Sequence, residues 1–443
     1  MTNPKTKSKK SVVDTVIARL KQLAPKLPDK RTGKNCRYTM ADIVLGAFSV
    51  FFLQCPSFLA RQRTIQHQRG RSNAQTIFKM ERIPCDNHIR NMLDAVPPEH
   101  FYPEFRALLE IVREQGYLDA YRVLDDKYLL MSLDGTQYFS SYVIECELCS
   151  RQKRRNGKVQ CHHKAILPVI VAPGNPHVLA QPPEFITPQD GTAKQDCEIA
   201  ACKRWITQHA AYYAADNLIL TGDDLYAHQP LCQHVLDHHL HFVFVCKPDS
   251  HKTLYAVLEE RADEVETLVV HHWNGEHGEI WTYRYCAALP LRAGDDALLV
   301  NWCELHITHA ETGETMYHNA WVTDLTITAK NITAIVMCAR AHWKVENENH
   351  NVLKTKGYHL EHNFGHGQQY LALTLLTLNL LAFLLHTVMH LSNKIYRRIR
   401  QARGRREAFF NDVRALLVYL TFESWAAVLA FMAGALEIRP PPD

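Results

Sequence analysis

The sequence has no internal repeat and no low-complexity tract, and these absences exclude repeat architectures and long disordered segments. Glycine and proline are present at ordinary counts, 18 and 20 in 443 residues, and charged residues make up 22% of the chain. Hydrophobic residues make up 47%. A chain of this length and composition can bury a sizeable core, and we expect two or three globular domains.

The N-terminus is basic but lacks the apolar segment of a secretory signal peptide. The chain has 13 cysteines, which is an odd number. We therefore expect reduced thiols in a cytoplasmic compartment. In such a compartment, clustered cysteines are read as metal ligands before they are read as disulfides.

One long apolar run, residues 370–389, is long enough to cross a membrane. Its polar interruptions are Thr374, Thr377, Asn379 and His386. A buried central helix has the same appearance, and the polar residues favour that interpretation. We expect no membrane partner.

Positive charge is concentrated near the two ends of the chain, although the net charge is only +4. Residues 1–40 hold eleven lysines and arginines against two aspartates, and residues 394–406 hold seven with no acid. Basic ends around an acidic body indicate a polyanionic partner, most often nucleic acid. The alternative is that these residues form ordinary solvated surface helices.

The periodicity of apolar residues changes from helical to strand-like at about residue 128. Three strands and then alternating helices and strands follow, which predicts a mixed α/β sheet after an all-helical N-terminal domain. The expected divisions are a helical DNA-binding domain with a basic tail (1–125), the first part of an α/β domain (126–249), a β-rich insertion (250–325), the second part of the α/β domain (326–390) and a basic helical tail (391–443).

Two acidic residues close buried strands of the expected sheet. Asp134 ends "YLLMSLDG" and Asp223 ends "NLILTGDD". Ligands collect beyond the ends of strands in open α/β sheets, so these carboxylates are expected to meet and to bind magnesium. Glu346, on a later polar helix, is a candidate for the third acid. The alternative is that strand-end aspartates only cap turns.

Each of the last two positions has an acidic competitor nearby. Asp224 follows Asp223, but adjacent residues at a strand end point to opposite faces, so only one can ligate. Glu348 and Glu346 point about 200° apart on a helix, at roughly 100° per residue. Glu346 is favoured because its face also carries His342 and His350.

The segments "SLDGT", "LTGDDLYAHQ" and "HWKVEN" resemble the three acidic blocks of DDE-type insertion-sequence transposases. The resemblance covers about residues 128–390 and implies a ribonuclease H-like catalytic domain with a β-rich insertion. It implies that Asp134, Asp223 and Glu346 hold two magnesium or manganese ions. The implied activity is cleavage at transposon ends and strand transfer into target DNA, by a homodimer on double-stranded DNA.

The chain departs from many relatives around the glutamate. His342, Ala339 and Leu353 stand where those relatives have arginine, tyrosine and lysine. The nearest basic residues, taken as candidates for contact with DNA, are Arg340, Lys344 and Lys354. Two other functions are considered: a metal-dependent nuclease of the same fold without strand transfer, and a domesticated DNA-binding protein.

A second possible metal site lies in "CELCSRQKRRNGKVQCHH". Two cysteines two residues apart, opposite a Cys-His pair across an Asn-Gly turn, have the form of a zinc hairpin. The expected structural zinc ligands are Cys146, Cys149, Cys161 and His163, with His162 as a substitute. The basic turn between them, with Arg154 and Arg155, is expected to contact DNA. The alternative is a hairpin whose thiols are simply buried.

Overall fold

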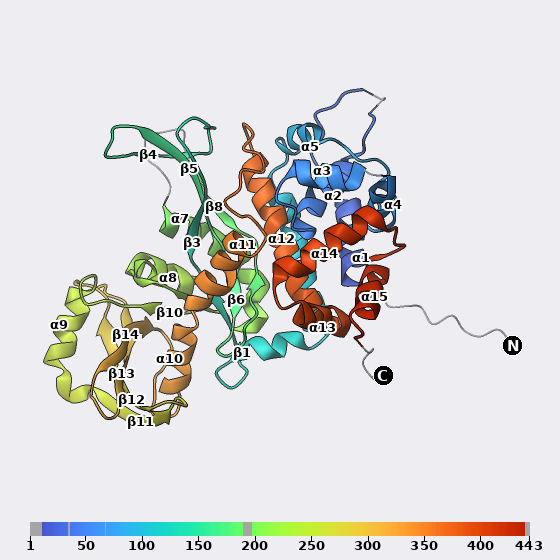
Figure 1. Cartoon of the computed structure of the whole chain (residues 1–443). Coiled ribbons are helices and arrows are strands. Elements are labelled where there is room, and N and C mark those ends of the chain that lie inside the picture. The colour runs from blue at the N-terminus through green and yellow to red at the C-terminus, as the bar shows by residue number, and fades with distance from the viewer. Residues whose placement is uncertain (1–10, 34–35, 67, 189–196, 439–443) are drawn as a thin grey trace.

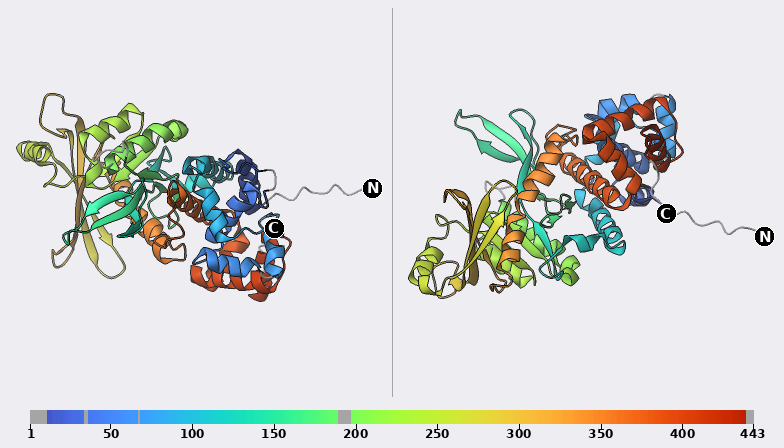
Figure 2. Two further views of the ribbon diagram at one scale, coloured as in Figure 1. Left: turned by 90° about the horizontal axis from the view of Figure 1, so that it is seen from above. Right: turned by 60° about the horizontal axis from the view of Figure 1, so that its bottom comes forward.

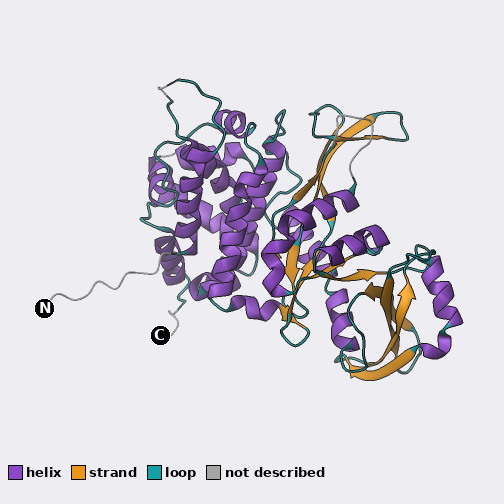
Figure 3. Cartoon of the chain, turned by 180° about the vertical axis from the view of Figure 1, so that it is seen from behind, coloured by secondary structure: helices purple, strands orange, loops and turns teal. Residues whose placement is uncertain are grey.

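The computed structural model describes residues 11–33, 36–66, 68–188 and 197–438, so the first ten residues of the predicted basic tail lie outside the described part. The fold is mixed α/β. A helical body lies on one side of the molecule and the strands on the other (Figures 1 and 3). This agrees with the predicted class.

The central sheet contains ten strands, and β2 (Tyr128–Ser132) lies inside it. Strand β2 pairs in parallel with β9 and antiparallel with β6, and β9 pairs in parallel with β10. Almost every residue of these strands is buried, as expected for a sheet covered on both faces. The neighbouring elements are β1 (Arg122–Val123), β6 (Val169–Val171), β7 (Leu179–Ala180), β9 (Ile219–Gly222), β10 (His241–Val245), α7 (Glu198–His209) and α8 (Gln229–Asp237).

Strands of the predicted insertion extend this sheet rather than forming a separate one. Strand β14 pairs antiparallel with β10, and β14, β13, β12 and β11 form an antiparallel meander. Figure 2 shows these strands at the end of the molecule opposite the helical body. Their bounds are β11 (Glu266–Trp273), β12 (Gly278–Pro290), β13 (Leu299–His309) and β14 (Thr315–Thr323), preceded by α9 (Lys252–Glu260).

A second, four-stranded sheet begins directly after Asp134. It contains β3 (Gly135–Ser141), β4 (Ser150–Lys153), β5 (Val159–Ile166) and β8 (Glu184–Ile186). The β4–β5 hairpin projects from the body (Figure 1). Strand β3 ends at Ser141, so both Cys146 and Cys149 lie on the loop between β3 and β4.

The apolar run forms α12 (Leu371–Ser392), which among the described residues is the one helix long and apolar enough to cross a membrane. It is buried inside the helical body. Thr374 donates to the carbonyl of Val96 at 2.6 Å and Asn379 to that of Tyr358 at 3.0 Å. The polar interruptions are therefore hydrogen-bonded inside a protein core, which accounts for the run without a lipid environment.

Helices from both ends of the chain pack together around α12 (Figure 1). The Asn73 amide donates to the carbonyls of Leu417 and Leu420, at 2.8 and 2.7 Å, and so ties the two ends together. The helices are α1 (Val12–Leu23), α2 (Met40–Phe52), α3 (Phe58–Gln66), α4 (Gln68–Thr76), α5 (Asp86–Leu93), α6 (Tyr102–Glu114), α13 (Lys394–Arg403), α14 (Arg406–Tyr419) and α15 (Trp425–Ala435).

The polar helix expected to carry Glu346 is divided. Helix α10 (Ile332–Arg340) ends first, a π-helical turn spans Val345–His350, and α11 (Asn351–Thr355) follows. In the π turn, the amide of Asn351 donates to the carbonyl of Glu346, five residues earlier. Such turns are rare and are frequent at functional sites, and this one includes both candidate glutamates.

Candidate functional site

The two strand-end aspartates lie next to each other. Ser132 on β2 is opposite Thr221 on β9, and the amide of Leu133 donates to the Thr221 carbonyl at 2.9 Å. Continuing this parallel register by two residues sets Asp134 opposite Asp223, across a strand spacing of about 4.8 Å. Burial raises the pKa of Asp223, and the charge of Asp134 raises it further. Two adjacent carboxylates of this kind favour a bound cation.

The carboxylate of Asp224 binds a different part of the structure. It accepts from the Lys247 amide at 2.6 Å and from the Ser250 hydroxyl, and it lies 3.4 Å from Nε2 of His251. Asp223 makes one hydrogen bond of this type, from the amide of Leu225 at 2.9 Å. Asp224 therefore fixes the loop after β10, which leaves Asp223 as the carboxylate that faces Asp134.

The polar helix is attached to the end of β2 by two histidines. Nδ1 of His342 lies 2.8 Å from the Ser132 hydroxyl, and Nδ1 of His350 lies 3.3 Å from Oδ2 of Asp134. Glu346 lies midway between them in the sequence, and its side chain is exposed to solvent. His342 and His350 thus point toward the end of β2, while Glu346 itself is exposed. Glu348 has a different neighbour, since its charge acts on the buried Lys344.

A fourth carboxylate, which the sequence did not single out, belongs to Glu198 at the start of α7. It accepts from the Tyr226 hydroxyl at 3.0 Å, and a Cβ at Gly135 would lie only 2.4 Å from its Oε1. Burial raises the pKa of Glu198, and the charges of Asp134 and Asp223 add to the rise. An acid in the first turn of a helix is too common to identify such a residue from sequence.

The residues predicted to contact DNA differ in their surroundings. Arg154 and Arg155 are exposed at the tip of the β4–β5 hairpin, where Arg154 also donates to Gln160 at 2.7 Å. Lys354 pairs with Glu361 at 3.1 Å. These three side chains remain at or near the surface.

Arg340 and Lys344 are engaged within the protein. The guanidinium of Arg340 lies over the rings of Trp281 and Tyr317, at 5.1 and 4.7 Å. Lys344 is only 5% exposed, and its ammonium group donates to the carbonyl of Asn175 at 2.8 Å. Lys344 therefore supports the helix that carries Glu346, and its charge is not presented at the surface as predicted.

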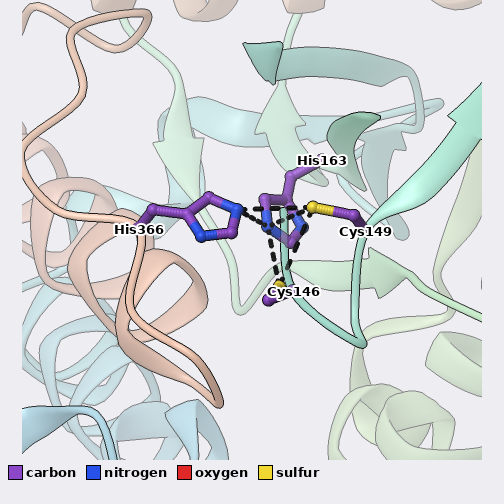
Figure 4. Close-up of side chains that lie close together, drawn as sticks. All are labelled: Cys146, Cys149, His163 and His366. Carbon is purple, nitrogen blue, oxygen red and sulfur yellow. Dashed lines mark hydrogen bonds between the residues drawn. The ribbon is translucent and has the colours of Figure 1, made fainter. Parts of the chain in front are cut away.

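A buried cluster of two thiols and two imidazoles lies where β3, β5 and the loop before α12 meet. Its members are Cys146, Cys149, His163 and His366, whose ligand atoms all lie within 4.8 Å of one another (Figure 4). The two sulfurs are 3.8 Å apart and the two Nε2 atoms 3.1 Å apart. The three measured sulfur–nitrogen distances are 3.6, 3.5 and 3.3 Å.

These distances fit a tetrahedral metal site. Zinc bonds of about 2.3 Å to sulfur and 2.0–2.1 Å to nitrogen give tetrahedral edges of roughly 3.8 Å between sulfurs, 3.5 Å between sulfur and nitrogen, and 3.3 Å between nitrogens. The pKa of Cys146 is lowered by hydrogen bonds from Cys149, His163 and His366. A thiolate is the form that binds metal. The cluster could therefore hold a metal ion.

The predicted ligand set was wrong in one member, because His366 stands in place of Cys161. The Cys161 thiol instead contacts a carboxylate oxygen of Glu145 at 3.6 Å, and His162, the predicted substitute, points to the opposite face of β5 from His163. Nδ1 of His366 lies 2.9 Å from the Gly367 carbonyl. That hydrogen bond fixes the ring with Nε2 toward the cluster, as outer hydrogen bonds do for metal-binding histidines.

Comparison with known proteins gives no further constraint on the site. No protein-family model matches the chain, and none of the curated proteins is significantly similar to it. The functional argument therefore depends on the two carboxylate-bearing strand ends, the polar helix and the Cys/His cluster.

Proposed function

We propose that the protein is a DNA transposase of the DDE type, with a ribonuclease H-like catalytic core. The observation that carries the proposal is the position of Asp134 and Asp223 just beyond the ends of two adjacent parallel strands, with His350 joining Asp134 to the π turn that contains Glu346. Three oxygen ligands from separate elements are suited to hard divalent cations.

The proposed cofactors are two magnesium or manganese ions held by Asp134, Asp223 and Glu346. Such ions activate an attacking oxygen and stabilise the leaving oxygen in phosphodiester chemistry. The residues fit this role because burial and the charge of Asp134 both raise the pKa of Asp223, and a cation held between the two carboxylates would relieve their repulsion. The partners would be transposon-end and target DNA, bound by a homodimer in the cytoplasm.

We also propose that the Cys/His cluster holds one structural zinc. Its ligands come from the β3–β4 loop, β5 and the loop before α12, which are far apart in the sequence (Figure 4). A metal bond among them would fix the base of the basic β4–β5 hairpin against the segment between the Glu346 helix and α12. The hairpin would then present Arg154 and Arg155 to DNA as a rigid element.

A strand cleavage and joining assay tests the proposed function. The purified chain is incubated with labelled duplexes from the flanks of its gene, a target plasmid and Mg²⁺ or Mn²⁺. We expect cleaved ends and joined products, both absent in EDTA. Cleavage without joining would support the nuclease of the same fold. DNA binding without cleavage would support the domesticated DNA-binding protein.

A further inference from the structure

A cavity of about 200 Å³ lies on the helical side of the molecule. It is formed by the end of α12, by α13, by the start of α14 and by the loop between β6 and β7. None of the described residues lining it is acidic. The residues that matter for the argument are His177, His390, Arg400 and Arg406.

Arg400 has unused hydrogen-bonding capacity at this cavity. Its Nη1 is buried and has no hydrogen-bond partner among the described residues, although its guanidinium lies over the Phe409 ring at 5.6 Å. Burial lowers the pKa of Arg400. A buried cationic donor without an acceptor is costly, and an anionic ligand would remove that cost.

The other charged side chains around the cavity are also positive. The rings of His177 and His390 lie 4.2 Å apart. Burial lowers the pKa of both, and the charges of Arg397, Arg400 and Arg406 lower them further, to about 4 for His390. Burial and the surrounding positive charge thus both favour the neutral imidazoles, which are available to donate to an anion or to take up protons beside it.

The neighbouring arginines are already positioned by the protein. Arg406 donates to the Tyr358 hydroxyl at 2.7 Å, and Arg397 donates to the carbonyls of His390 and Leu391 at 3.0 and 2.8 Å. Both contribute charge while being held by neutral groups. The cavity therefore has a fixed positive potential, and the guanidinium of Arg400 is still available to bind an anion.

We propose that this cavity binds a phosphate group, with Arg400 as its principal donor and His177 and His390 beside it. A planar guanidinium matches phosphate oxygens in a bidentate manner, and the volume is ample for a phosphate ester. The phosphate could belong to the DNA backbone or to a free compound such as a nucleotide. The site does not depend on the proposed function, since its chemistry is that of phosphate alone.

The loop that lines the cavity at His177 also contacts the segment that carries Glu346. His177 lies two residues after Asn175, whose carbonyl accepts the hydrogen bond from Lys344. Lys344 directly precedes the π turn that contains Glu346. A phosphate beside His177 would therefore lie against the same loop that supports the Glu346 helix.

Calorimetric titration of the full chain with inorganic phosphate, at ionic strength held constant with chloride, tests the proposal. We expect saturable binding that Arg400→Gln weakens by at least about tenfold. Lys394→Gln is the matched control, because it removes the same charge from an exposed position on α13. This control should bind phosphate as the wild type does.

A gel shift with a short DNA duplex distinguishes the two sources of phosphate. If the ligand is a backbone phosphate, Arg400→Gln weakens duplex binding and inorganic phosphate competes with the duplex. If the ligand is a free phosphate compound, duplex binding is unchanged while phosphate binding is lost. Should Arg400→Gln fail to fold, His390→Gln must show the weakened phosphate binding. No saturable binding by the wild type, or equal binding by the folded variants, would overturn the proposal.

Discussion

Asp134→Asn and Asp223→Asn are each expected to abolish metal-dependent DNA cleavage, by more than about 100-fold. Mutation of residues that only hydrogen-bond to a metal ligand typically lowers activity by up to about 100-fold. Mutation of a direct ligand should lower the cleavage rate by more than that. Asparagine keeps the size of the side chain and removes its charge. DNA binding should persist, because the basic hairpin and helices are untouched. Cleavage rates and gel shifts on the same preparations measure both properties.

Asp224→Asn is the matched control for these variants. Its carboxylate accepts from Lys247 and Ser250 on the loop after β10, and an asparagine oxygen can still accept from the Lys247 amide. Cleavage should stay within about threefold of the wild type, since one weakened surface hydrogen bond has a small effect. An inactive Asp224→Asn beside an active Asp223→Asn would show that the second acid has been wrongly assigned.

Loss of the proposed zinc from the Cys/His cluster has the second largest expected effect. Protein purified without added metal should contain about one zinc per chain, and Cys149→Ser or His366→Asn should contain almost none. Because a structural zinc contributes its binding free energy to folding, the melting temperature should fall by at least about 5 °C. Elemental analysis and thermal unfolding by circular dichroism measure the two effects.

Cys161→Ser is the control that distinguishes the ligand set found in the structure from the set predicted from the sequence. Cys161 lies beside the cluster on β5 and contacts Glu145, but it is not one of the four converging ligands. This variant should keep its zinc and its melting temperature. Zinc lost from Cys161→Ser and kept in His366→Asn would restore the ligand set predicted from the spacing. If the wild-type protein contains no zinc, the four residues are ordinary buried core residues.

The acidic positions were predictable because they depend on local order along the chain. A buried apolar run followed by an acid gives the strand end, and polar groups at the ends of neighbouring strands collect at one edge of an α/β sheet. Strands β2 and β9 are such neighbours, although six strands and α7 separate them in the sequence. Glu198 was missed because only the folded chain reveals that its carboxylate packs on Gly135.

The metal cluster was only partly predictable, for the opposite reason. Cys146, Cys149 and His163 come from one hairpin, so their proximity follows from local spacing. His366 lies 203 residues beyond His163. Its segment, "NFGHG", has the composition of an ordinary loop. No periodicity could indicate that this loop folds against β5, and Cys161 was the nearest plausible substitute in the sequence.

The packing of the two ends of the chain is another feature that periodicity could not supply. An amphipathic helix shows which face is buried but not what covers it. Helices α1–α6 and α13–α15 share one core around α12, and Asn73 reaches the carbonyls at the end of α14. The π turn was equally hidden, because its residues read as a continuous polar helix.

The most direct measurement of the central claim is strand cleavage by Glu346→Gln and Glu348→Gln, compared with the wild type in Mg²⁺ or Mn²⁺. Both substitutions keep size and remove one charge. Glu346 lies between His342 and His350, which contact Ser132 and Asp134, whereas Glu348 acts on Lys344. We predict a loss of more than about 100-fold for Glu346→Gln and less than about threefold for Glu348→Gln. Equal losses in the two variants, at unchanged circular dichroism, would contradict the account.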